Sequence, residues 1–162
     1  YKVKEDYYSG RDEGRQKTDE DYYKDLEKFI GSISQEQTVD DYGYYSSKLK
    51  GVIVDPSAAS FITLIKQRGK FPVQDANNDV LDGIRNVATA LKTGMIYYND
   101  CCTNTFREFF SYVWDAKAQE RGEDKPVKEN DHALDSDRYF VHTVLFNGPE
   151  TLETGDLGLG NW

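Results

Sequence analysis

One short run, Gly51-Val-Ile-Val-Asp-Pro56, constrains the fold of this chain most strongly. Its three consecutive β-branched residues predict a strand buried on both faces, as strands are when helices cover both sides of a sheet. Pro56 lacks a backbone N–H, so the strand is expected to end beside it. Asp55 is therefore expected at the carboxyl end of a strand, where α/β folds bind their ligands. An Asx turn or a helix cap explains Asp55 equally well.

The sequence around this strand alternates between helical and extended patterns. Apolar spacing, with start and stop signals, predicts helices over 18–31, 57–69, 79–94, 104–110 and 130–146. Aromatic and β-branched runs predict strands over 1–8, 51–55, 71–74 and 95–98. Residues 111–115 and 125–128 are expected to pair as a long hairpin with 117–124 at its tip. This alternation indicates an α/β layer architecture.

The length of 162 residues, with 38% hydrophobic content, suits one domain with its own core. We assign residues 1–146 to this domain. Residues 147–162 are assigned to a C-terminal tail, because Gly148–Trp162 contains four glycines and no hydrophobic period.

The net charge argues against an autonomous DNA-binding protein. There are 29 acidic and 20 basic residues, which gives a formal charge of -9. Such a surface repels nucleic acid phosphate, so DNA binding would need a local basic patch or metal ions.

Cysteine usage and hydropathy indicate the compartment. Cys101 and Cys102 are adjacent, which suits neither a disulfide nor a zinc knuckle, so a reducing compartment is expected. No apolar run reaches the roughly 18 residues that a membrane span needs. We therefore expect a soluble cytoplasmic protein without a membrane partner.

Three carboxylates and a histidine lie within residues 131–137, at the start of the last predicted helix. Residues three and four apart share a helix face, and the polar face here comprises Asp131, His132, Asp135, Tyr139 and His142. The opposite, apolar face comprises Ala133, Leu134, Phe140, Val141, Val144 and Leu145. The polar face suits Mg²⁺ or Mn²⁺, but acidic residues at a helix N-terminus also simply favour the helix dipole. His142 lies a turn or more beyond the acidic residues and is expected to be structural or exposed.

Asp137 interrupts the apolar face. A buried, unpaired carboxylate costs several kcal/mol or shifts its pKa upward. We expect a weakened contact between helix and sheet there, since Arg138 is adjacent in sequence but points elsewhere.

Four segments resemble the C-terminal nuclease domain of phage terminase large subunits: GVIVDPSAASFITLIKQRG, DANNDVLDGI, SYVWD and KPVKENDHALDSDRYF. Their most specific motifs are Asp-Pro-Ser at a strand end, Asn-Asp-Val-x-x-Gly-Ile, and Glu-Asn-Asp-His-x-x-Asp. The resemblance runs from about Tyr7 to Thr143.

This resemblance implies a ribonuclease H-like mixed sheet flanked by helices, and an endonuclease that cuts concatemeric double-stranded DNA with Mg²⁺ or Mn²⁺. It implies that Asp55 and Asp135 are catalytic carboxylates and metal ligands, that Asp131 assists as a ligand, and that His132 is catalytic. Such enzymes hold two ions about 3.5 to 4 Å apart with carboxylates from separate elements. The implied partners are double-stranded DNA, the terminase ATPase domain, the small subunit and the portal, in the cytoplasm of a bacterial host.

Lys125 and Lys128 flank the acidic run and are expected to contact DNA phosphate, although solvated hairpin lysines are as common.

The sequence also departs from that family. The family's first catalytic Asp lies on an opening central strand, and this sequence is expected to begin after it. Asp6 and Asp12 belong to the next strand and its turn, so they are not substitutes. No Gly-x-x-x-x-Gly-Lys-Ser/Thr loop is present, which excludes the packaging ATPase from this sequence.

Three hypotheses follow. The first is a metal-dependent endonuclease domain of a terminase large subunit. The second is a catalytically incomplete prophage remnant of that domain, which acts as a partner-completed or binding module. The third is an unrelated acidic binding protein whose motifs match by chance.

Overall fold

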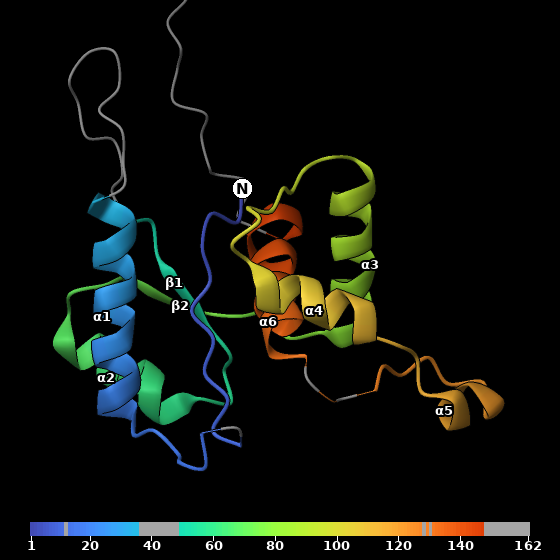
Figure 1. The fold of residues 1–162 in the computed structure, drawn as a ribbon, viewed down its shortest axis with the longest axis horizontal. Helices are drawn as coiled ribbons and strands as arrows, with labels where there is room; N and C mark the ends of the chain where they lie inside the picture. Colours follow the sequence, from blue (N-terminus) through green and yellow to red (C-terminus); the bar gives the residue numbers. More distant parts are fainter. Residues whose placement is uncertain (12, 36–48, 128, 130, 148–162) are drawn as a thin grey trace, which may run out of the picture.

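The computed structural model describes residues 1–11, 13–35, 49–127, 129 and 131–147. The predicted tail lies outside the described residues except for Asn147. Figure 1 shows α1, α2 and two strands on one side, and α3, α4 and α6 on the other, with the N-terminal segment, residues 1–8, running between them. The described residues therefore form a mixed α/β unit.

The first helix, α1 (Asp19–Gln35), begins with reciprocal hydrogen bonds. Thr18 N–H donates to Asp21 Oδ2 (3.1 Å), and Asp21 N–H donates to Thr18 Oγ1 (3.2 Å). The predicted end near Gly31 is wrong, because the helix continues through that residue. Glycine inside a helix costs only about 1 kcal/mol relative to alanine, and this cost does not end the helix.

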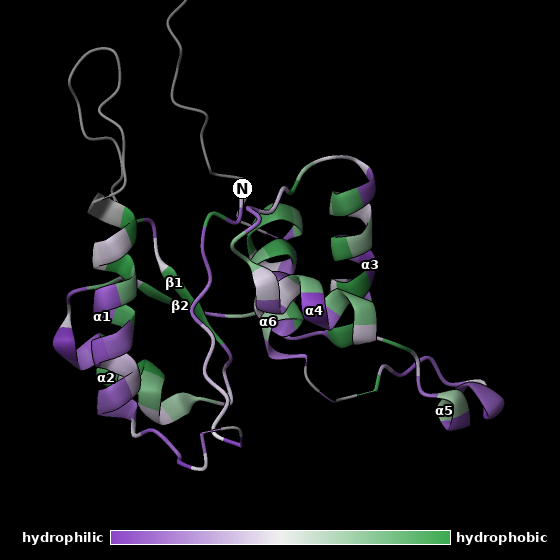
Figure 2. Cartoon of the chain, viewed as in Figure 1, coloured by the Kyte–Doolittle hydropathy of each residue, from purple (hydrophilic) through white to green (hydrophobic). Residues whose placement is uncertain are grey.

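A parallel pair of strands follows. Strands β1 (Val52–Val54) and β2 (Val73–Asp75) are joined by α2 (Ala59–Arg68), and Val52 pairs with Val73. Gly69 ends α2 in the left-handed conformation (φ 63°), as predicted. β1 is only half-buried, so the expectation of burial on both faces is wrong. A strand is buried on both faces only where helices cover both sides of the sheet, and the helix that packs on β1 is α6. Figure 2 shows β1, whose three residues are Val52, Ile53 and Val54, in the hydrophobic colour.

The helices predicted over 79–94, 104–110 and 130–146 are confirmed, with small differences at their ends. Asp79 caps α3 (Val80–Lys92) by accepting from Asp82 N–H. Helix α4 (Thr103–Ser111) and helix α6 (His132–Phe140) pack on each other. A π-helix, η1 (Val141–Phe146), follows α6 without a break, and both α6 and η1 pack on α3. A small core there contains Ala90, Ile96 and Val141, with Val87 and Tyr98 against it.

Strands predicted over 1–8 and 95–98 do not form. The two segments share one parallel bridge, Lys2 with Tyr98, closed by Lys2 N–H to Tyr97 O (2.7 Å) and Asn99 N–H to Lys2 O (3.0 Å). Aromatic residues favour strands only where neighbouring strands can pack against them. Here the N-terminal segment is held mainly by side chains that reach α4 and α6.

The predicted hairpin is present as a single antiparallel bridge between Trp114 and Pro126. Its tip contains a short helix, α5 (Ala116–Glu120), capped by Asp115. Figure 1 shows this hairpin projecting away from α4 and α6. Among the helices in the described ranges, none has the length and apolar character needed to cross a membrane.

Candidate site between β1 and α6

Asp55 lies just after β1 and faces α6. Its Oδ1 accepts from Ser57 N–H (2.9 Å), which is the Asx turn considered above. Its Oδ2 accepts from the hydroxyl of Tyr139 on α6 (2.6 Å). The Tyr139 hydrogen bond, then the bonds from Ser57 and the charge of Arg138, lower the pKa of Asp55 against an opposing effect of burial. Asp55 is therefore a charged carboxylate that also joins the strand to the helix.

Tyr139 is a protonated donor at neutral pH. Burial is the largest cause that raises the pKa of its hydroxyl to about 12, followed by the hydrogen bond to Asp55 and the charge of Asp135. Its role is not evident from sequence, because tyrosine on a polar helix face also fits ordinary solvent exposure.

Asp135, in the first turn of α6, is paired with Arg138 one turn later. Asp135 Oδ1 accepts from Arg138 Nη2 (2.8 Å) and Nε (3.1 Å). Arg138 Nη1 donates to the backbone carbonyls of Asn78 (3.0 Å) and Asp79 (3.1 Å). The spacing of three residues predicts this pair. The pair was missed from sequence because Arg138 was considered only as a partner of Asp137.

Asp131 lies at the start of α6, one turn before Asp135. It is buried, and its backbone carbonyl accepts from Asp135 N–H (2.7 Å). Burial first, and then the charges of Asp135 and Asp131, raise the pKa of Tyr112 to about 12. Tyr112, Asp135 and Arg138 also line a cavity of about 140 Å³ between α3, α4 and α6. The charges of Asp131 and Asp135 thus both act on Tyr112.

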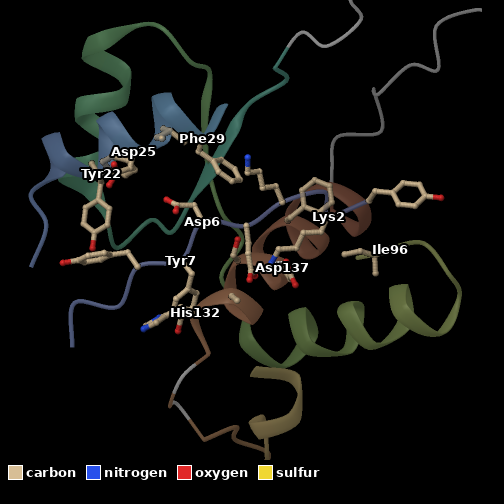
Figure 3. A pocket seen from close by; sticks show the side chains of 18 of the residues that line it. Lys2, Asp6, Tyr7, Tyr22, Asp25, Phe29, Ile96, His132 and Asp137 are labelled. Atoms are coloured by element: carbon tan, nitrogen blue, oxygen red, sulfur yellow. Dashed lines mark hydrogen bonds and ion pairs between the residues drawn. The ribbon is translucent and has the colours of Figure 1, made fainter. Parts of the chain in front are cut away.

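His132 faces a different cavity. Its side chain is exposed, and its ring lies 6.4 Å from the ring of Tyr7. It shares its face with Ser136 and Phe140, and all three line a cavity of about 660 Å³ beside residues 1–8 (Figure 3). The predicted common face of His132 with Asp135 is therefore not observed. The catalytic role of His132 stays a prediction.

His142 is buried and hydrogen-bonded to Asn86 of α3, with 2.7 Å between Asn86 Nδ2 and His142 Nδ1. This contact agrees with the structural role expected for it. The predicted apolar face is incompletely buried, since the side chains of Phe140 and Leu145 are exposed and line the larger cavity.

Asp137 is buried but paired, so the predicted unpaired carboxylate is wrong. Lys2 Nζ lies 2.9 Å from Asp137 Oδ1, and the same ammonium donates to Thr105 Oγ1 (2.7 Å). Burial raises the pKa of Asp137, while the charge of Lys2 and its hydrogen bond to the carboxylate oppose the rise. Figure 3 shows Lys2 and Asp137 directed toward each other. Arg138 does point elsewhere, as expected.

Lys125 is exposed and pairs with Glu123 Oε2 (2.9 Å) on the projecting hairpin. Lys128 and Asp12 lie outside the described residues. Contact of either lysine with DNA stays a prediction.

The described residues do not by themselves fit a two-metal centre. Carboxylate oxygens suit Mg²⁺ and Mn²⁺, and Asp55 and Asp135 offer them from two elements. Within the described ranges, however, no three or more His, Cys, Asp or Glu side chains gather as a metal site requires. Tyr139 and Arg138 instead engage the two carboxylates.

The fold and this site define a class: a small mixed α/β unit in which a carboxylate at a strand end faces a carboxylate-bearing helix. The chain is similar to the large terminase from the thermophilic bacteriophage D6E. Its structure with ATP-gamma-S, crystal form 3, matches with a TM-score of 0.76 and 62% identity over 88% of this chain and 33% of that chain. Crystal form 2 gives 0.76 and 63% over 88% and 32%.

The chain thus spans about a third of the length of the terminase chains it matches. No protein-family model matches the sequence, and no curated protein does. The predicted resemblance is confirmed at the level of a phage large terminase. The 62% identity contradicts the hypothesis of a chance match by an unrelated acidic protein.

Proposed function

We propose that this chain is the nuclease part of a phage terminase large subunit, with a ribonuclease H-like fold, and that it cuts concatemeric double-stranded DNA during packaging. The observation that carries the proposal is the link between the strand-end carboxylate, Asp55, and the α6 carboxylate, Asp135, through Tyr139 and Arg138. These carboxylates lie in the motifs that resemble the nuclease domain, within a chain 62% identical to part of a large terminase.

In this proposal Asp55 and Asp135 contribute ligands to a site for Mg²⁺ or Mn²⁺, and Asp131 assists from beside Asp135. Within the described ranges these carboxylates do not gather as a cluster of three. His132 acts from the neighbouring cavity, and Lys125 and Lys128 contact phosphate. The partners are double-stranded DNA, the ATPase domain, the small subunit and the portal.

The test is cleavage of supercoiled plasmid by the purified chain with Mn²⁺ or Mg²⁺. Asp55→Asn and Asp135→Asn are each expected to reduce cleavage at least about a hundredfold, because a neutral amide is a far weaker metal ligand than a carboxylate. Asp82→Asn is the matched control, since Asp82 is an exposed helical aspartate that pairs with Arg85. Cleavage unaffected by either site variant would contradict the proposal.

A second candidate is the incomplete domain that needs a partner segment. The larger cavity favours it: about 660 Å³ lies between the N-terminal segment, α1, and α6 with η1 (Figure 3). The aromatic side chains that line it include Tyr7, Tyr8, Tyr22, Phe29, Phe61 and Phe140. Such a groove suits an extended segment with alternating apolar side chains.

This candidate is tested by extending the chain at its N-terminus with the segment that precedes the matched region in the D6E terminase. Cleavage by the extended chain alone would support partner completion. Equal cleavage by both chains would contradict it and favour the self-sufficient nuclease.

A further inference from the structure

Arg138 is a buried cation beside the candidate site, and all three nitrogens of its guanidinium donate hydrogen bonds. Its side chain is 4% exposed. Two of its nitrogens donate to Asp135, and the third donates to the two carbonyls that precede α3. Paired, multiply bonded guanidinium groups hold a fixed geometry, because the five donors lie in one plane.

The neighbouring helix is shaped around this arginine. A Cβ atom placed on Gly83 of α3 would lie 2.6 Å from Arg138 Cγ and 2.8 Å from Cδ. Any residue larger than glycine would therefore displace the arginine stem. The absence of a side chain at Gly83 is what allows the guanidinium to reach both Asp135 and the carbonyls.

Tyr139 continues the connection to β1. The guanidinium carbon of Arg138 lies 4.7 Å from the centre of the Tyr139 ring, which is within range of a cation–π contact. The hydroxyl of the same ring donates to Asp55 Oδ2. Arg138 and Tyr139, which we call the clamp, thus join Asp135 to Asp55 through adjacent residues of one helix.

The clamp does for these carboxylates what a bound cation would do. The charge of Arg138 helps to keep Asp55 ionised, and its hydrogen bonds engage an oxygen of Asp135. Tyr139 engages an oxygen of Asp55. These are oxygens that a divalent cation would take as ligands.

We propose that the clamp holds Asp55 and Asp135 in position and competes with a divalent cation for them. The inference rests on the proposed function, because it takes Asp55 and Asp135 as the ligands. Cation binding at this site then requires Tyr139 to release Asp55 and Arg138 to turn away from Asp135. A clamp residue consequently lowers the affinity of the site for metal while it raises the stability of the fold.

The test is Mn²⁺ binding to the full chain, followed by the electron paramagnetic resonance signal of free Mn²⁺, with thermal unfolding measured in parallel. Tyr139→Phe removes only the hydroxyl and should tighten Mn²⁺ binding about threefold to tenfold, the range set by one released hydrogen bond. Arg138→Gln should tighten it about tenfold or more, because a charged competitor leaves. Both variants should unfold at lower temperature.

Arg85→Gln is the matched control, since Arg85 and Asp82 form the same three-residue pair on α3 but are exposed. It should leave Mn²⁺ affinity unchanged. Tyr139→Phe is the decisive variant if Arg138→Gln fails to fold, because it keeps the ring and its packing.

The possible failures are distinguishable. If Asp55→Asn abolishes Mn²⁺ binding but Tyr139→Phe leaves it unchanged or weaker, the clamp is wrong and the metal site stands. If no variant binds Mn²⁺, the clamp is overturned together with the proposed ligands. If Tyr139→Phe binds more tightly but plasmid cleavage never appears, the clamp stands and the nuclease assignment fails.

Discussion

At the scale of single residues, several buried ionisable side chains in this protein find hydrogen-bond or charge partners distant in sequence. Lys2 reaches Asp137 from the N-terminal segment, and Glu108 of α4 accepts from the N–H groups of Ala133 (2.8 Å) and Leu134 (3.0 Å) at the start of α6. Each of these side chains satisfies a group that would otherwise be buried at a cost. Their removal should therefore cost more than the loss of an exposed contact.

Lys2→Ala tests this at the buried pair. It leaves the carboxylate of Asp137 buried without its ammonium partner, so the free energy of unfolding should fall by about 3 kcal/mol. Replacing both residues, Lys2→Met with Asp137→Leu, should recover most of this loss because no charge remains buried. Urea unfolding measures both, with the exposed Lys28→Ala as control. A double variant as unstable as Lys2→Ala would show that the charge is not the cause.

Tyr139→Phe should change how stability depends on pH. The Tyr139 hydrogen bond is the first cause that holds the pKa of Asp55 below its ordinary value of 3.8. A carboxyl whose pKa is lower in the folded state stabilises the fold above the unfolded-state value and loses that contribution as pH falls through the folded-state value. The original chain should thus exceed the variant in stability above about pH 4, and the difference should shrink below about pH 3. Urea midpoints across this range give the result, and a constant difference would contradict it.

At the scale of elements, α6 is positioned from three sides. Glu108 of α4 caps its first turn, α3 packs along it, and Tyr139 ties it to Asp55 beyond β1. Helix α4 is itself capped from the N-terminal segment, because Glu5 accepts from the N–H groups of Asn104 (2.6 Å) and Thr105 (3.1 Å). A carboxylate at a helix N-terminus satisfies free N–H groups and opposes the positive end of the helix dipole.

Gly83→Ala tests the fit between α3 and α6. Alanine normally stabilises a helix interior by about 1 kcal/mol relative to glycine. At Gly83 the sign should reverse, with a loss of about 1 to 3 kcal/mol, because the added Cβ overlaps the stem of Arg138. Gly31→Ala is the matched control, since a Cβ there meets no atom within 4 Å and should stabilise α1. Equal effects at the two positions would contradict the close packing.

At the scale of the whole molecule, residues 1–8 connect the two groups of elements. The segment pairs with Tyr98 through Lys2, caps α4 through Glu5, and lines the larger cavity opposite α1. Because the contacts of Lys2 and Glu5 lie on α6 and α4 rather than in a wide sheet, this end of the segment should unfold together with these helices.

Hydrogen–deuterium exchange followed by mass spectrometry checks this cooperativity. The N–H groups of Lys2 and Asn99 donate across the bridge, so they should exchange at the rate of the α6 backbone. Lys2→Ala should accelerate exchange at Asn99 and in the first turn of α6 alike. Rapid exchange at Lys2 and Asn99 with slow exchange in α6 would show that the N-terminal segment is separately unstable.

Local patterns predicted the parts of this fold that depend on neighbours in sequence. The β1–α2–β2 unit, the Asp79 cap and the Gly69 stop are set by residues within a few positions. Strands over 1–8 and 95–98 were predicted wrongly, since strand formation depends on what lies beside a segment. The pairs Lys2–Asp137 and Tyr139–Asp55 join residues 135 and 84 positions apart, and no sequence period encodes them.

The change from α6 to the π-helix η1 separates two demands on one continuous helix. A π-helix closes its hydrogen bonds over five residues instead of four, so each turn contains more residues than a turn of α6. Asp135 and Tyr139 lie in the segment with the α-helical period, and His142, which packs on α3, lies in the segment with the π-helical period. The directions of these side chains are therefore set by two different helical periods. A substitution in η1 can then change the winding of that segment alone. The direction in which Asp135 and Tyr139 project toward Asp55 stays the same.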